Sequence, residues 1–236
     1  LPAAAAGNGP GNGSGGTSVV QPAPISAEES AGLSFMREEE KLARDVYTTL
    51  GSQWGLAEFS NIAASEQKHM DAIATLLTRY GVADPAAGNG AGEFTNAELQ
   101  ALYDQLVEMG SQSAADALKV GALIEETDIE DLLGELASVT HSDIERVYTQ
   151  LNQGSENHLR AFAKSLQTTS GEVYVPQVLD QATYDAILSG SNGGSRGGRQ
   201  GNAGGQGQQP GRGSQAPGNN QRQFQGRGQM QGQGDG

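Results

Sequence analysis

Four long stretches with helical spacing of apolar residues constrain the fold of this chain more than any other feature. Apolar side chains recur every three or four residues over residues 28–50, 57–80, 113–137 and 142–166, which is the spacing of one face of an α-helix. A shorter periodic stretch ends at Gly110, in the connection between the second and third long ones. We find no pattern of a β-sheet and no repeat of fixed period. The sequence therefore predicts an all-α bundle of four long helices with a short crossover helix.

Turn and capping residues predict where these helices begin and end. Ser26 stands three residues before Glu29, which is the pattern of a capping box at the start of the first helix, and Gly51 is its predicted end. After the last long helix, Val173 and Val175 alternate in a way that predicts a short extended piece laid on the bundle. The other predicted ends are Gly81 for the second helix, Thr95 with Glu98 for the start of the short helix, and Thr183 for a last turn that ends near Leu188.

The two ends of the chain differ from its middle in composition. Residues 1–27 carry no charge, and residues 190–236 are mostly Gly, Gln, Asn, Ser and Arg. Such segments bury too little apolar surface to offset the entropy of ordering, so we predict that both are disordered. Between them we expect the four-helix bundle at 28–168 and a C-terminal extension at 169–189 that packs on it.

Charge argues against nucleic acid as a partner of the folded part. The chain has 14 Lys and Arg against 28 Asp and Glu, a formal net charge of −14. Its last 47 residues hold five Arg and one Asp, so the remainder carries −18, a strongly repulsive charge for a polyanion. The tail stretch SRGGRQG has a faint likeness to Arg-Gly segments that bind RNA. Its arginines are sparse, and we interpret the tail as a solvated linker.

The chain has no cysteine, which excludes disulfides, thiolate metal sites and thiol nucleophiles. It has no run of 18 apolar residues, so no membrane span is predicted. The sequence starts at Leu1, and LPAAAAGNG is compatible with the remainder left after signal-peptide removal, as it is with a trimmed chain. We expect export to the cell surface or beyond, with the cytoplasm as the alternative.

The apolar face of the second long helix is interrupted by polar residues. Glu66 and His69 are three residues apart, so they share one face of a helix, and that face also carries Ile62 and Ile73. We therefore expect this pair to point toward the core.

Each of the other three long helices carries a polar residue on its apolar face: Glu40, Glu125 and His158. An unpaired buried carboxylate costs several kcal/mol, and no Lys or Arg lies on these inner faces. A pair of divalent metal ions would neutralise the carboxylates, and imidazole with carboxylate suits iron or manganese. The conjunction predicts a dinuclear metal site at mid-bundle.

Ordinary structural roles compete with this hypothesis at each position. A Glu-x-x-His pair on a helix is usually exposed, and a single buried histidine is more often hydrogen-bonded than metal-bound. Glu38 and Glu39 belong to the charge run REEEK and are interpreted as a solvated face. His141 is interpreted as a residue of a cap region, and Glu126 is the second choice beside Glu125.

Several stretches resemble the ferritin-like superfamily and its rubrerythrin branch. EKLARDVY places Glu40 and Tyr47 at the spacing of that family's first helix, and AASEQKH matches its A-x-x-E-x-x-H motif at Glu66 and His69. The wording of REEEKLARDVY, GALIEETDIEDL and GSENHLRAF is similar to an uncharacterised, DUF2202-type branch. The resemblance covers about residues 28–190 and implies a ferritin-like four-helix bundle that holds two iron ions, or manganese.

The last long helix departs from the family pattern. The family has Glu three residues before His158, where this chain has Ser155 with Glu156 beside it. Three alternatives are open: Asp128 supplies the missing carboxylate, a π-bulge turns Glu156 inward, or one metal position is weak or empty. The candidate ligands are thus Glu40, Glu66, His69, Glu125, Asp128 and His158, with Glu126 and Glu156 as second choices.

The resemblance implies oxidation of metal by oxygen or peroxide, as in a ferroxidase or peroxidase. Tyr47 would hydrogen-bond a ligand or carry electrons, unless it is an ordinary core tyrosine. Because the chain has no cysteine-based redox domain, a full peroxidase cycle would need an external electron donor. The alternative is a non-enzymatic cell-surface or matrix protein, with the bundle as scaffold and the tail for attachment. We expect a monomer or a homo-oligomer.

Overall fold

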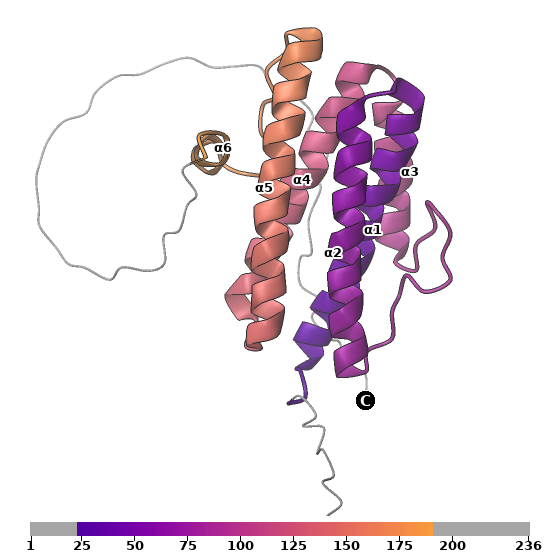
Figure 1. Ribbon diagram of the computed structural model, residues 1–236, viewed down its shortest axis with the longest axis vertical. Helices are drawn as coiled ribbons and strands as arrows, with labels where there is room; N and C mark the ends of the chain where they lie inside the picture. Colours follow the sequence, from indigo (N-terminus) through magenta and orange to yellow (C-terminus); the bar gives the residue numbers. More distant parts are fainter. Residues whose placement is uncertain (1–22, 191–236) are drawn as a thin grey trace, which may run out of the picture.

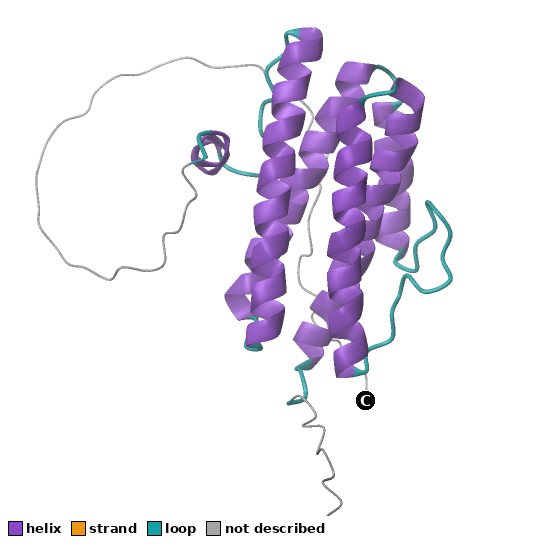
Figure 2. Ribbon diagram, viewed as in Figure 1, coloured by secondary structure: helices purple, strands orange, loops and turns teal. Residues whose placement is uncertain are grey.

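Six α-helices make up most of residues 23–190, the part of the chain that the computed structural model describes. They are α1 (Ala27–Trp54), α2 (Ala57–Tyr80), α3 (Ala97–Gly110), α4 (Ala114–Ser138), α5 (Ser142–Ser170) and α6 (Gln181–Leu188). Figure 2 shows no strand in this part of the chain, which confirms the all-α prediction. The predicted disordered ends, 1–27 and 190–236, lie outside the described residues apart from 23–27 and 190.

The four long helices form two antiparallel pairs, α1 with α2 and α4 with α5, which stand side by side (Figure 1). The short helix α3 packs against α1 and α4, and α6 lies beside α5, where Figure 1 shows it end-on. None of the helices in the described part of the chain is long and apolar enough to cross a membrane. The predicted bundle of four long helices with a short crossover helix is therefore confirmed.

Two apolar clusters fill the bundle, one on either side of its middle. The first contains the rings of Tyr47, Phe59 and Phe162, whose centroids lie 5.1 to 5.9 Å apart. The second contains Ile73 and Tyr148. Buried polar residues lie between the clusters on each long helix: Glu40, Glu66, Glu125, Asp128, Ser155 and His158. We refer to these six residues, together with His69, as the polar layer.

The first helix runs past its predicted end. Ser26 and Glu29 form the predicted capping box, but α1 continues through Gly51 to Trp54 and ends at Gly55, which has a left-handed backbone with φ of 67°. A Cβ atom at position 51 would lie 2.8 Å from Cβ of Phe59. Gly51 therefore serves the close approach of α1 to α2 and does not stop the helix.

Two predicted caps are wrong, one by a single residue and the other by three. The N-cap of α3 is Asn96 and not Thr95, because the Asn96 side chain accepts hydrogen bonds from the first amides of the helix. The N-cap of α6 is Asp180 and not Thr183, and Oδ1 of Asp180 accepts the Ala182 amide at 2.9 Å. In both cases a side chain with a longer reach satisfies the free N–H groups of the first turn.

In the C-terminal extension, the side chains that face solvent and those that pack on the bundle are the reverse of the predicted ones. Val173 and Val175 are 71% and 69% exposed, while Tyr174 between them is 4% exposed. The extension does lie against the bundle, but the residue that packs is the tyrosine, and no strand forms between α5 and α6.

The charge run REEEK is not a solvated face. Glu38 and Glu39 are only 3% and 5% exposed. Glu38 accepts hydrogen bonds from the amides of Thr95 and Asn96 at the start of α3, and buried Lys41 donates to the Gly90 carbonyl at 2.7 Å. The run is buried because the crossover connection folds over α1 and uses its charged groups as hydrogen-bond partners.

Candidate metal centre

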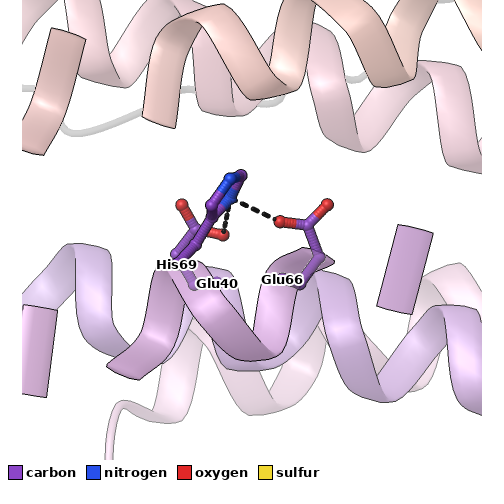
Figure 3. A group of neighbouring side chains, drawn as sticks. All are labelled: Glu40, Glu66 and His69. Carbon is purple, nitrogen blue, oxygen red and sulfur yellow. Dashed lines mark hydrogen bonds and ion pairs between the residues drawn. The ribbon is translucent and has the colours of Figure 1, made fainter. Parts of the chain in front are cut away.

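Carboxylate and imidazole groups from all four long helices meet in the polar layer. Glu40, Glu66 and His69 form one group, and Glu66, Glu125 and His158 form another. Within each group the ligand atoms lie within 4.8 Å of one another. Figure 3 shows the first group, whose side chains point from the α1–α2 pair toward the α4–α5 pair. The structure thus brings five of the predicted ligands together in two groups that share one carboxylate.

Glu66 belongs to both groups and offers one oxygen to each. Its Oε2 lies 2.7 Å from Nδ1 of His69, and its Oε1 lies 2.7 Å from Nδ1 of His158. Despite this distance, Glu66 Oε1 and His158 Nδ1 have no aligned hydrogen-bond partner among the described residues. These two atoms are thus buried and close together without an aligned hydrogen bond, so both keep a lone pair or a proton that a metal ion could replace or engage.

Glu40 and Glu125 complete the two groups from α1 and α4. Glu40 Oε2 lies 3.2 Å from Nδ1 of His69, and Glu125 Oε2 lies 3.5 Å from Nδ1 of His158. The hydroxyl of Tyr47 donates a hydrogen bond to Glu125 Oε1 at 2.7 Å, which fixes the carboxylate in one orientation. Tyr47 therefore contacts a candidate ligand and is also a buried residue of the aromatic core.

Asp128 pairs with the serine that replaces the expected glutamate. The Ser155 hydroxyl donates to Asp128 Oδ2 and also lies 3.0 Å from the Leu151 carbonyl. The other oxygen, Asp128 Oδ1, is buried and has no hydrogen-bond partner among the described residues. Glu156 lies outside both groups, near Asn152 and Arg160, and α5 is α-helical throughout without a π-bulge. Of the two carboxylates weighed for this position, Asp128 is the one in the polar layer.

Glu126 faces the C-terminal extension. Its Oε2 accepts hydrogen bonds from the Tyr174 hydroxyl and the Gln177 amide, both at 2.9 Å, and from the Val178 amide at 3.4 Å. The structure therefore places this second-choice residue outside both candidate groups. It holds the segment after α5 against α4, a function that local sequence patterns did not indicate.

Burial and neighbouring charge set the protonation of the polar layer. Burial, and then the charge of Asp128, raise the pKa of Glu40 well above its usual value. Burial and Glu125 raise the pKa of Asp128 to about 7. Burial alone would raise the pKa of Glu66, but the two histidines that lie 2.7 Å from its oxygens outweigh burial and lower that pKa to about 2. Burial would lower the pKa of His158, yet the two glutamates beside it raise the pKa to about 10. Without metal, imidazolium rings are the counter-ions of the buried acids.

Gly154 makes room for one of these rings. A Cβ atom at position 154 would lie 2.7 Å from both Cε1 and Nε2 of His69. This glycine is not among the predicted site residues, although a glycine inside a long helix, one residue before Ser155, is a signal of close approach.

The residues present fit a pair of divalent ions. No Lys or Arg forms an ion pair with the acids of the polar layer among the described residues. Three buried oxygens of the polar layer have no hydrogen-bond partner within residues 23–190: Glu40 Oε1, Glu66 Oε1 and Asp128 Oδ1. Carboxylate oxygen and imidazole nitrogen are good ligands for iron, manganese and zinc. A cation is the group that such a donor set lacks.

Fold and donor set together define a class of protein, a helical bundle with a buried carboxylate–histidine centre that is suited to metal. Comparison with known proteins then gives the family: the chain belongs to the family described as "Uncharacterized protein domain (DUF2202)", which matches residues 29–191. This confirms the DUF2202-type part of the resemblance seen in the sequence.

One relative has both a known sequence and a solved structure. The chain is 49% identical over 168 residues to "Uncharacterized protein MJ0754" of Methanocaldococcus jannaschii, a match that covers 71% of this chain and 90% of the relative. It is also similar to the solved structure titled "Crystal structure of hypothetical protein MJ0754", with a TM-score of 0.69 over 71% of this chain and 95% of that one. Neither description names an activity, so function has to be argued from the site itself.

Proposed function

We propose that this protein binds two divalent metal ions, iron or manganese, in the polar layer and uses them to oxidise iron or to reduce oxygen or peroxide. The observation that carries the proposal is Glu66, one carboxylate whose two oxygens each lie 2.7 Å from the imidazole of a different group. A carboxylate in that position is suited to bridge two ions. Together with a Glu from each of two other helices, it follows the ligand pattern of dinuclear bundles.

The energetics of the metal-free layer support a role for metal. Four buried carboxylates face two histidines, and burial disfavours charge on most of the acids. A buried cation removes this conflict, since ligand carboxylates and imidazoles lose their protons when metal binds. Part of the free energy of metal binding therefore becomes free energy of folding.

Each side chain has a distinct role in this proposal. Glu40 and His69 would hold one ion, Glu125 and His158 the other, and Glu66 both. Asp128 would supply the carboxylate that Ser155 lacks, with the serine hydroxyl orienting it. The bound ions would supply the redox chemistry.

Tyr47 is a positioning residue for Glu125 through its 2.7 Å hydrogen bond. Its ring lies between the polar layer and the aromatic core, with Phe59 and Phe162 as neighbours. We extend the proposal to electron transfer through this ring. An external electron donor would be needed for repeated turnover.

The test is a single-turnover oxidation. Protein loaded anaerobically with Fe(II) is mixed with oxygen or with peroxide, and Fe(III) formation is followed by absorbance. The parent is expected to oxidise iron faster than the same iron in buffer, and His69→Ala to lose this acceleration. His141→Asn is the matched control, because His141 lies at the N-cap of α5 and in neither group. A parent no faster than buffer would overturn the redox proposal, and a parent that takes up no metal would favour the scaffold alternative.

A further inference from the structure

A second row of acidic side chains lies beside the polar layer, along the contact between α1 and α4. Asp128, Asp131 and Glu135 follow one another at spacings of three and four residues on α4, so they share one face of that helix. Glu39 of α1 faces this row: apart from burial, its strongest interactions are with Asp131 and Asp128, and it makes a side-chain hydrogen bond with Asp131. We call Glu39, Asp131 and Glu135 the acidic seam.

The acidic seam leads from the surface to the polar layer. Asp131 and Glu135 are half-buried, whereas Glu39 and Asp128 are each 5% exposed. Gly32 of α1 leaves space for the outer end of the seam, because a Cβ atom there would lie 2.1 Å from Glu135 Oε2. At the inner end, Asp128 interacts with acids of the polar layer. Carboxylates are thus available at successive depths between solvent and the candidate metal centre.

Within residues 23–190, no basic side chain forms an ion pair with Glu39 of the seam or with Asp128 at its inner end. Glu39 Oε2 and Asp128 Oδ1 are buried without a hydrogen-bond partner among the described residues. The basic side chains nearest to Glu39 in sequence are engaged elsewhere: Arg37 pairs with Asp84 at 3.0 Å, and Lys41 pairs with Asp45 at 2.6 Å. The charged neighbours that act most strongly on Glu39 are all acids. A cation that binds beside these buried carboxylate oxygens stabilises their charged form.

A small cavity adjoins Glu39. It has a volume of about 20 Å³ and is lined by Glu39, Thr127 and aliphatic side chains of α1, α3 and α4. This is enough for one water molecule. A divalent cation loses its hydration water reluctantly, so space for one water beside a buried carboxylate allows stepwise exchange of water for protein oxygens.

We propose that the acidic seam is the entry route for divalent cations. Glu39 and Asp131 form a transient binding site on this route, from which the ion moves to Asp128 and the metal centre. This entry role rests on the proposed metal function of the polar layer. The half-buried acids Asp131 and Glu135 raise the local concentration of cations. Glu39, whose Oε2 has no hydrogen-bond partner among the described residues, binds the ion between surface and centre.

The test separates the rate of metal loading from the amount of metal bound. Metal-free protein is mixed with Co(II), loading is followed by visible absorbance in a stopped-flow instrument, and the bound metal is counted at equilibrium by elemental mass spectrometry. Asp131→Asn removes one seam charge, and Glu39→Gln removes the carboxyl group that binds the ion in this proposal, each with little change of shape. Glu130→Gln is the matched control, because it removes one charge from an exposed position next to Asp131 on the same helix. Circular dichroism checks that each variant is folded.

The two seam variants are expected to load Co(II) about tenfold more slowly than the parent, with the final stoichiometry unchanged. The control is expected to load at the parent's rate, and added salt is expected to slow the parent more than the Asp131→Asn variant. Seam variants that load as fast as the parent would overturn the entry route and leave the metal centre intact. A reduced final stoichiometry in Glu39→Gln would also overturn it, because Glu39 would then be a ligand. A parent that binds no Co(II) would instead refute the metal centre itself.

Discussion

Asp128 makes the stability of the metal-free protein fall as the pH rises. Burial and the neighbouring Glu125 raise its pKa from 3.8 to about 7 in the folded chain. Between these two values the folded state keeps a proton that the unfolded state has released, so the free energy of unfolding decreases with increasing pH. The contribution is fully present below the unfolded pKa and is lost as the pH passes the folded one. At about 1.4 kcal/mol per pH unit, raising the pH from 5 to 8 removes about 3 kcal/mol.

Asp128→Asn removes this contribution. The variant cannot titrate, and its amide oxygen still accepts the Ser155 hydroxyl. Urea unfolding of both proteins at pH 5 and pH 8, with a chelator present, gives the four free energies of unfolding. The parent is expected to lose about 3 kcal/mol more than the variant between the two pH values. Equal losses in parent and variant would refute the claim that Asp128 is held protonated in the metal-free fold.

Three other substitutions test the surroundings of the site. Gly154→Ala places a Cβ atom 2.7 Å from the His69 ring and is expected to weaken Co(II) binding about tenfold or more in a titration. Gly134→Ala is the control, because no atom lies within 4 Å of its new Cβ. It should leave Co(II) binding unchanged and raise the free energy of unfolding by about 0.5–1 kcal/mol. Equal Co(II) affinities of the two variants would contradict the placement of His69. Tyr47→Phe leaves Glu125 Oε1 without its donor and is expected to cost the metal-free protein about 1–3 kcal/mol in urea unfolding, so an unchanged unfolding curve would count against that hydrogen bond. Tyr174→Phe removes a donor from Glu126 and should speed limited proteolysis within residues 171–180, as read by mass spectrometry; cleavage at the parent's rate would show that Glu126 does not hold the extension.

The long helices could be predicted because their signals are local. Apolar periodicity and the Ser26–Glu29 capping box are both set within a few residues, and both match the structure. Gly51 shows the limit of such signals. Its sequence context is that of a helix stop, but its actual constraint is Phe59 on the next helix, whose Cβ would lie 2.8 Å from a Cβ at position 51.

Inward-facing ligand candidates could be predicted from their place on apolar stripes, but other buried charges could not. Glu38 has its partners 57 and 58 residues away in the crossover connection, and Glu126 has partners 48 to 52 residues away in the C-terminal extension. Each belongs to a local run of charge that is typical of a solvated surface. Burial there depends on which loop folds over the helix, and local periodicity carries no information about that.

The contact between Ser155 and Asp128 is another feature that local sequence patterns could not predict. The sequence alone shows that Ser155 departs from the family pattern, and it leaves Asp128 as one of three alternatives for the missing carboxylate. Their hydrogen bond joins α4 to α5 across 27 residues. Only the packing of the two helices brings this donor and acceptor together.

A count of bound metal tests the central claim most directly. Protein reconstituted anaerobically with Fe(II) and freed of excess metal is measured by elemental mass spectrometry, beside a Glu66→Ala, His69→Ala double variant and the exposed control Glu130→Gln. We predict about two iron ions per chain in the parent and the control, and far fewer in the double variant. No iron in the parent, or as much in the double variant as in the parent, would contradict the account of a metal centre that shares Glu66.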